Sequence, residues 1–298
     1  MTNIQLCEPT ELYNILNQRD LKGLPCVSDR TYLLLLDVRE YSAYEESHIV
    51  TSRHSIRDSA GGDFQIPADA EVETKHHCVV YDSCTESLSD KESDVYCCAK
   101  MLSELTCKKP IMILNGGYER FSALYPLLKS FQIIFSPREL QGLKLLPLEV
   151  VPGTVYMGTA AQAQDGELMK RLAVRCLVNA SPEVSVSVAE GVELKEVDLN
   201  DTVDVSPQLR EISQLIEKYR AKKIPILVVS SDSLSRSVVL VLGYLMKRNK
   251  WTLEKSWKIL KQNKSYIRPT VGYMKHLSNF EEEVCEERTT NITIPNLM

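Results

Sequence analysis

Residues 224–237 read IPILVVSSDSLSRS, and this stretch decides the fold of the second half of the chain. Its first six residues are apolar, which predicts a strand buried on both faces. A polar loop follows, and a long apolar helix begins after it. A strand, a short loop and a helix N-terminus bring several free backbone N–H groups to one point, which suits an anion. Arg236, in the first helical turn, can add a bidentate contact to a phosphate.

Strands and helices alternate on both sides of this stretch. In the second half we expect strands near 154–157, 175–179, 192–197 and 224–229, and helices near 207–221, 235–248, 252–262 and 270–286. In the first half we expect strands near 32–36, 77–81 and 111–114, and helices near 10–18 and 92–106. Such alternation predicts α/β folds with parallel sheets covered by helices.

The chain is long enough for two domains. It has 298 residues, of which 44% are hydrophobic, so each domain can bury a core of its own. A boundary is expected where Ser136-Pro137 and Pro147 bracket a stretch without clear period. The predicted division is a first domain at 1–135, a linker at 136–147, a second domain at 148–290 and a tail at 291–298.

Composition and charge exclude several classes of function. The net charge of −5 gives no global attraction to nucleic acid or to anionic membranes. No apolar run approaches the length of a membrane span. The nine cysteines are an odd number and follow no signal peptide, so we expect reduced thiols in a cytoplasmic protein. His76-His77-Cys78 lacks a second pair at metal-binding spacing, so neither a metal nor a cofactor is expected.

The loop in the second half resembles that of the dual-specificity phosphatases, which reads HCxxGxSRS. Ser235, Arg236 and Ser237 match the motif, whereas Val229 stands at the histidine position, Ser230 at the cysteine and Ser233 at the glycine. The resemblance covers about 148–287. Its first strand is similar to VVPGTVYMG (150–158), its central strand to CLVN (176–179), and its last helix to the stretch from IRP (267–269) to Leu277.

The resemblance implies a lost nucleophile. In that family a thiolate attacks phosphorus, and the loop lowers the pKa of the thiol. The serine hydroxyl of Ser230 needs a general base, but Val229 is apolar and the nearest acid is Asp232. Loss of a nucleophile typically lowers the rate about a million-fold. The chain is therefore expected to be no enzyme.

The family's general acid, an aspartate, precedes the helix at 207–221. A gap-free alignment puts Leu199 at that position, with Asp198 and Asp201 on either side. A one-residue shift of the alignment restores a carboxylate. Without a general acid to protonate the leaving group, the rate falls by roughly a further 100-fold.

The loop is also a vestigial phosphate site. Its residues are Ser230, Ser231, Asp232, Ser233, Leu234, Ser235 and Arg236. Phosphate binding is opposed by Ser233, where the backbone can need a conformation that only glycine takes cheaply, and by the negative charge of Asp232. The alternative is structural: Arg236 and Ser235 stabilise the loop and cap the helix that begins near 235.

The first half resembles the rhodanese family over about 5–135. The similar segments are LDVRE (36–40), which is followed by Tyr44 and His48, and NGGYERF (115–121). The resemblance implies that Asp37 and Arg39 close a loop by an ion pair. Asp82 stands where sulfurtransferases have their catalytic cysteine, and Cys84 comes two residues late. Sulfur transfer is therefore not expected.

A cysteine-free rhodanese-like domain before a dual-specificity phosphatase domain is the layout of the MAP kinase phosphatases. In that family clustered arginines of the first domain dock the kinase. The corresponding stretch here, 51–64, offers only Arg53 and Arg57, flanked by Asp58 and Asp63. Two arginines do not justify transferring kinase docking to this chain.

These observations together predict a non-catalytic scaffold or regulator. Its expected partners are proteins: phosphoproteins, kinases or active phosphatases, without nucleic acid or membrane. One alternative is a reader that binds phosphate through Arg236 and the loop amides without hydrolysing it. A second is an enzyme with weak residual phosphatase activity.

Overall fold

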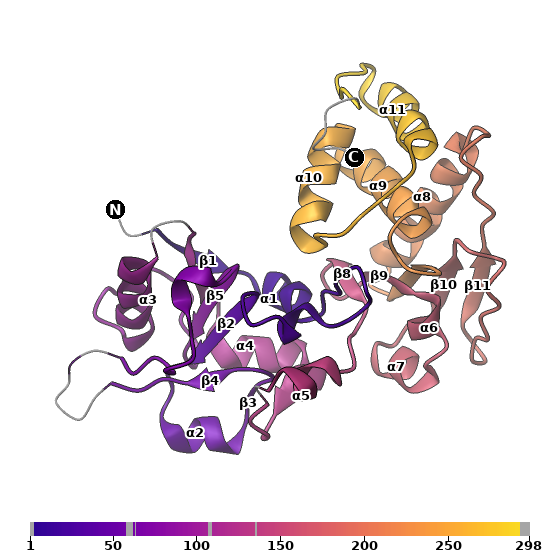
Figure 1. The fold of residues 1–298 in the computed structure, drawn as a ribbon. Coiled ribbons are helices and arrows are strands. Elements are labelled where there is room, and N and C mark those ends of the chain that lie inside the picture. The colour runs from indigo at the N-terminus through magenta and orange to yellow at the C-terminus, as the bar shows by residue number, and fades with distance from the viewer. Residues whose placement is uncertain (1–2, 58–61, 63, 107–108, 135, 293–298) are drawn as a thin grey trace. The chain divides into compact units, whose positions relative to one another are not determined.

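The computed structural model describes residues 3–57, 62, 64–106, 109–134 and 136–292 (Figure 1). The chain forms two compact units, Met1–Leu145 and Leu146–Met298. Each unit is an α/β fold with its own sheet and its own buried core. The predicted fold class is confirmed.

The first unit is built on a five-stranded parallel sheet in the order β1-β6-β5-β2-β4. Its strands are β1 (Ile4–Cys7), β2 (Leu33–Asp37), β4 (Arg53–His54), β5 (His77–Tyr81) and β6 (Ile111–Leu114). A separate antiparallel pair joins β3 (His48–Ile49) to β7 (Lys129–Ser130). All four residues of β6 are buried, as expected for a central strand covered on both faces.

Helices pack around this sheet (Figure 1). They are α1 (Pro9–Leu16), α2 (Tyr41–Glu46), α3 (Asp94–Leu105), α4 (Gly117–Leu124) and α5 (Pro137–Gln141), with 3-10 turns at Cys26–Ser28, Val72–Thr74 and Pro126–Leu128. Helix α3 buries Val95, Cys98 and Leu102, which are spaced three and four residues apart and therefore share one face of the helix. That face packs against β5 and β6.

The second unit has a five-stranded sheet in the order β11-β10-β12-β9-β8, with β8 antiparallel to its neighbour. Its strands are β8 (Leu148–Val151), β9 (Val155–Thr159), β10 (Cys176–Asn179), β11 (Glu193–Glu196) and β12 (Ile226–Ser230). Every residue of β12, the central strand, is buried. It pairs with β10 on one side and with β9 on the other.

The helices of the second unit cover both faces of this sheet. They are α6 (Ala160–Ala163), α7 (Gly166–Arg171), α8 (Ser206–Ala221), α9 (Arg236–Asn249), α10 (Leu253–Asn263) and α11 (Val271–Cys285). Ile226 and Val228 of β12 pack into the core formed with α8 to α11. Leu227 and Val229 point to the other face, toward α6 and α7. Such alternation is the two-residue period of a strand.

The predicted linker at 136–147 is largely part of the first unit. Residues 137–141 form α5, whose N-cap Ser136 makes a capping box with Glu139 and whose Leu140 is buried. A serine followed by a proline, with a glutamate three residues after the serine, is a helix-start signal. The helix was not predicted because the stretch has no clear apolar period. The first unit therefore extends to residue 145 rather than 135. Among the described residues, no helix is both long enough and apolar enough to cross a membrane.

Candidate functional site

The site predicted from residues 229–237 forms at the junction of β12 and α9. Val229 is fully buried in the core on the side of α6 and α7. Ser230, the last residue of β12, has only 1% of its surface exposed. The position that would hold a histidine is thus an apolar core residue, and the position of the nucleophile is an enclosed hydroxyl.

The hydroxyl of Ser230 is engaged by two neutral groups. Its Oγ lies 3.0 Å from the Oγ of Ser237, and the backbone N–H of Ser233 donates to it at 3.1 Å. Among the described residues, no other group is hydrogen-bonded to this oxygen. Neither neighbour is a general base, so nothing in contact with the hydroxyl draws its proton away.

Ser233 has the backbone conformation that favours glycine. Its φ is +59°, in the left-handed region, and its Oγ is buried without a hydrogen-bond partner among the described residues. A side chain in this region costs about 1–2 kcal/mol relative to glycine. The expectation that this position needs a glycine-like conformation is confirmed.

Several N–H groups of the loop already have partners within the protein. The N–H of Ser231 donates to Ser181 Oγ at 3.1 Å, and the N–H of Leu234 donates to Asp232 Oδ1 at 2.9 Å. These donors, with that of Ser233, are not directed at a common external anion. Ser235 makes no side-chain cap bond to α9, so its expected capping role is wrong.

Arg236 is paired with a carboxylate. Its Nη1 lies 2.5 Å from Oε1 of Glu183, which is on the loop after β10. Loops that follow neighbouring parallel strands meet at the same edge of the sheet, which explains the contact across 53 positions of sequence. Glu183 was not predicted, because only the strand order brings it beside α9. The guanidinium that would hold a phosphate here holds a glutamate.

A pocket of about 310 Å³ lies over the loop. The charged residues lining it are the cation Arg236 and three anions, Glu183, Asp201 and Asp232, while Ser230 contributes a hydroxyl. A phosphate dianion entering this pocket would face three carboxylates and one guanidinium. Like charges at this range oppose binding of the dianion.

The structure corrects the position of the candidate acid. Leu199 is 2% exposed and belongs to the core, whereas Asp201 lines the pocket. Asp198 is exposed and does not line it. The sequence alone did not single out Asp201, because no motif fixes the length of the loop between β11 and α8. A carboxylate is thus retained at the pocket.

Asp201 is held by the segment that leads into α11. Thr270 Oγ1 donates to Asp201 Oδ2 at 2.6 Å, and Nε2 of His276 lies 3.0 Å from the Asp201 carbonyl oxygen. A Cβ added to Gly272 would lie 2.5 Å from that same carbonyl oxygen, so only glycine permits this approach. The carboxylate is therefore fixed in place.

In the first unit, the position of the sulfurtransferase cysteine is occupied by a closed turn. Asp82 Oδ1 accepts from the N–H groups of Cys84 and Thr85 at 3.1 and 2.9 Å. The carbonyl oxygen of Asp82 accepts from the N–H of Tyr118, in the first turn of α4, at 2.8 Å. A Cβ on Gly117 would lie 2.5 Å from the same oxygen. The turn thus fills the helix N-terminus that would otherwise face an anion.

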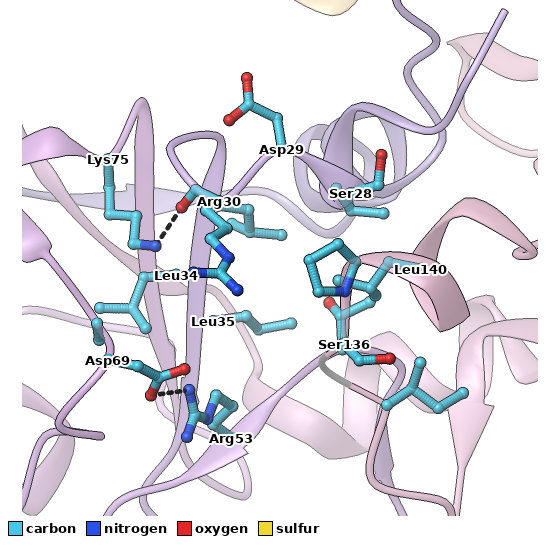
Figure 2. A pocket seen from close by; sticks show the side chains of 16 residues that line it. Ser28, Asp29, Arg30, Leu34, Leu35, Arg53, Asp69, Lys75, Ser136 and Leu140 are labelled. Carbon is cyan, nitrogen blue, oxygen red and sulfur yellow. Dashed lines mark hydrogen bonds and ion pairs between the residues drawn. The ribbon is translucent and has the colours of Figure 1, made fainter.

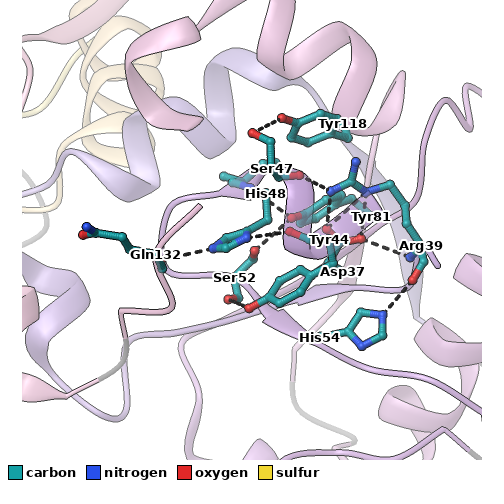
Figure 3. Close-up of polar contacts among 11 residues, drawn as sticks. Asp37, Arg39, Tyr44, Ser47, His48, Ser52, His54, Tyr81, Tyr118 and Gln132 are labelled. Carbon is teal, nitrogen blue, oxygen red and sulfur yellow. Dashed lines mark hydrogen bonds and ion pairs between the residues drawn. The ribbon is translucent and has the colours of Figure 1, made fainter. Parts of the chain in front are cut away.

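The ion pair implied for the rhodanese-like half is present (Figure 3). Arg39 Nη2 donates to Asp37 Oδ2 at 2.7 Å and to the carbonyl oxygen of Ser47 at 2.7 Å. The guanidinium also stacks on the ring of Tyr118, 3.8 Å from its centroid. Because Asp37 is fully buried at the end of β2, its pairing with Arg39 is needed to hold the loop.

The two arginines weighed for kinase docking are both paired. Arg53 Nη1 lies 2.5 Å from Asp69 Oδ1, at the edge of a pocket of about 250 Å³ (Figure 2). Arg57 Nε lies 2.8 Å from Asp94 Oδ1. Asp58 and Asp63, which flank Arg57 in sequence, lie outside the described residues. The two arginines are therefore not a cluster of unpaired cations.

The comparison with protein families agrees with the division of the chain into two α/β units. Residues 8–124 match the rhodanese-like domain, and residues 155–283 match the dual specificity phosphatase catalytic domain. Each match lies within one of the two units.

Some curated relatives match most of this chain and most of their own length. Dual specificity protein phosphatase 4 of Gallus gallus is 26% identical, over 93% of this chain and 81% of that protein. Dual specificity protein phosphatase 1 of Homo sapiens is 25% identical, over 84% and 78%. The crystal structure of human DUSP28 is 24% identical with a TM-score of 0.44, over 48% of this chain and 97% of that one. This chain is thus a two-domain α/β protein, in which a rhodanese-like domain with a parallel sheet is followed by a domain with the dual-specificity phosphatase fold.

Proposed function

We propose that this chain is a catalytically inactive pseudophosphatase of the serine/threonine/tyrosine-interacting type. It acts in the cytoplasm as a scaffold or regulator of signalling, and it binds active phosphatases, kinases or their phosphoprotein substrates. The proposal has two parts, the absence of turnover and the binding of proteins, and they are supported by different observations.

The absence of turnover is supported mainly by the environment of Ser230. Its hydroxyl contacts Ser237 Oγ and the N–H of Ser233, and neither can accept its proton as a base. An alcohol must lose its proton to attack phosphorus effectively, whereas a thiol in such a loop is already ionised. A rate lower by about a million-fold is expected from this change alone.

The protein-binding role is supported by the packed cores that both units retain. Each keeps a well-packed core, yet the residues at the chemical positions, Ser230 and Asp82, are tied into local hydrogen bonds. A domain that keeps its fold but lacks the residues for catalysis still presents surfaces that can bind other proteins. The relatives named above carry the name of phosphatases, which is a statement about those proteins.

A phosphate reader is the weaker alternative. It would need Arg236 free and a positive pocket, but Glu183 pairs with the guanidinium and the pocket carries more carboxylates than cations. Titration with inorganic phosphate and with a phosphotyrosine peptide separates the two roles. Saturable binding that is lost in Arg236→Ala supports the reader, and its absence supports the scaffold.

Turnover is tested with p-nitrophenyl phosphate as the substrate. The wild-type protein and the Ser230→Ala variant are purified from cells in parallel and assayed side by side. We expect both proteins to give the rate of a buffer blank. A rate in the wild-type protein that Ser230→Ala abolishes would overturn the proposal of inactivity. Pull-downs with the two units, each used separately as bait, then identify which of them carries the partner.

A further inference from the structure

A second hollow of the phosphatase-like unit differs in character from the pocket over Ser230. It has a volume of about 520 Å³ and is lined by residues of α10, of α11 and of the segment 264–270 that joins them. We call it the α10–α11 groove. Thr270 lines both the groove and the pocket, so the two are neighbours.

The groove has an apolar floor and an apolar rim. Trp257 and Met274 are buried, at 2% and 3% exposure, and form part of the lining. On the rim, Tyr266 is 37% and Val271 is 55% exposed. Large apolar side chains exposed beside a hollow of this size mark a place where a partner's side chain can be buried.

The charged residues that line the groove are all cations. They are Lys261, Arg268 and Lys275, and each is exposed. Within the described ranges, none of the three forms an ion pair with a carboxylate, and no acidic side chain lines the groove. Lys261 Nζ lies 5.9 Å from the centroid of the Trp257 ring. Arg53, Arg57 and Arg236, by contrast, are each paired with a carboxylate.

We propose that the α10–α11 groove binds a protein segment in which carboxylates flank an apolar side chain. The apolar side chain enters the hollow against Trp257 and Met274, and the carboxylates pair with the three cations at its edge. The inference deepens the proposed scaffold function and rests on it, because it names the surface and the chemistry of the partner.

An acidic protein segment fits these observations better than a nucleic acid does. Nucleic-acid binding depends on neutralising many phosphates along a basic surface. Here three cations surround an apolar hollow in a chain whose net charge is −5. An apolar centre with a charged rim is the usual anatomy of a protein–protein contact.

The test uses three fluorescein-labelled peptides with the same apolar residues, EDDLFEELE, QNNLFQQLQ and KRRLFKKLK, and the full chain. We expect saturable binding of the acidic peptide alone, weakening as salt is raised. The double variant Lys261→Glu, Lys275→Glu should weaken that binding by about tenfold or more. Tyr266→Ala, which changes only an exposed rim residue, should weaken it by a few-fold.

The matched control is Lys170→Glu with Lys222→Glu, which makes the same charge change at exposed residues that do not line the groove. This control should bind the acidic peptide as the wild type does. Three outcomes would each overturn the proposal. The neutral peptide could bind as tightly as the acidic one, the control variant could lose as much affinity as the groove variant, or the acidic peptide could fail to bind at about 1 mM. Capture by phosphatidylserine vesicles that requires Lys261 and Lys275, without peptide binding, would overturn it in favour of a lipid surface. All these outcomes are independent of p-nitrophenyl phosphate turnover, so failure of the groove and failure of the proposed inactivity are separately visible.

Discussion

At the level of single residues, two positions of the phosphatase-like unit differ in how closely they match the residues that a phosphatase needs. Ser230 has a hydroxyl in place of a thiol, whereas Asp201 keeps a carboxylate at the pocket, held by Thr270. A carboxylate thus lines the pocket, whereas the thiol of the phosphatase motif is missing. Under the proposed inactivity, substitution at Ser230 should partly restore turnover.

We expect the double variant Ser230→Cys, Ser233→Gly to hydrolyse p-nitrophenyl phosphate at a measurable rate. A thiol ionises more readily than an alcohol, and glycine removes the strain at position 233. Adding Asp201→Asn should lower that rate about 100-fold, because the acid is lost. Asp198→Asn, at an exposed neighbour outside the pocket, should leave it unchanged. If Asp201→Asn has no effect, Asp201 is not the acid.

Ser233→Gly alone should stabilise the protein by about 1 kcal/mol. The change relieves the left-handed backbone of a residue with a side chain and removes a buried hydroxyl without a partner. Urea unfolding of the wild type and the variant measures the difference. Ser231→Gly, at an exposed neighbour whose φ is not positive, should give no stabilisation. Equal stabilisation by both changes would contradict the explanation.

The sequence was enough to find Ser230 but not its surroundings. Ser230 follows an apolar strand and precedes Ser235-Arg236-Ser237, so its place is fixed from both sides. Asp201 sits on a loop whose length no pattern defines, and the alignment chose Leu199 instead. Glu183 reaches Arg236 across 53 positions, and only the order of the strands predicts such a contact.

At the level of secondary-structure elements, the buried strands were the most predictable part of the fold. The runs at 77–81, 111–114 and 175–179 are apolar and short, and they became β5, β6 and β10 with ends within one residue. Short helices with few apolar residues, such as α6 and α7, were not predicted. Their helical starts depend on side-chain caps at Thr159 and Asp165 rather than on apolar period.

The contact between the loop after β10 and the start of α9 controls the charge of the pocket. We expect Glu183→Ala to raise the affinity for inorganic phosphate by about tenfold, because it frees Arg236 and removes one carboxylate. Isothermal titration calorimetry measures the change. Glu190→Ala, which removes an exposed carboxylate outside the pocket, is the matched control and should have no effect. Unchanged affinity in Glu183→Ala would show that Glu183 does not block the site.

At the scale of the whole molecule, the chain forms two compact units, and the first contains a partly buried histidine that couples its stability to pH. The first unit contains His77 at the start of β5, in edge contact with Tyr32. Burial lowers the pKa of His77 to about 4, and the nearby His76 and Lys109 add to the effect. The imidazole is therefore neutral in the folded state at pH values where the unfolded chain already binds a proton.

The first unit should therefore lose stability as the pH falls. Between pH 6.5 and 4 the unfolded state binds more protons at His77 than the folded state, so unfolding is favoured by acid. From pH 7 to pH 5 we expect a loss of about 2 kcal/mol from this group. Urea unfolding of the full chain at the two pH values, with the first unit followed by hydrogen exchange, measures it. His77→Gln should remove most of this dependence, and His76→Gln, at an exposed position, should keep it.

The replacement of sulfur at Ser230 has a consequence for redox conditions. A low-pKa thiolate is the group that peroxide oxidises first, and its sulfenic acid would block a phosphatase. No cysteine in the described ranges lines this pocket, and burial raises the pKa of the Cys176 thiol in the same sheet to about 12. The proposed binding of a partner at this unit should therefore be unchanged, in a pull-down, by peroxide at a concentration that inactivates thiol-dependent phosphatases.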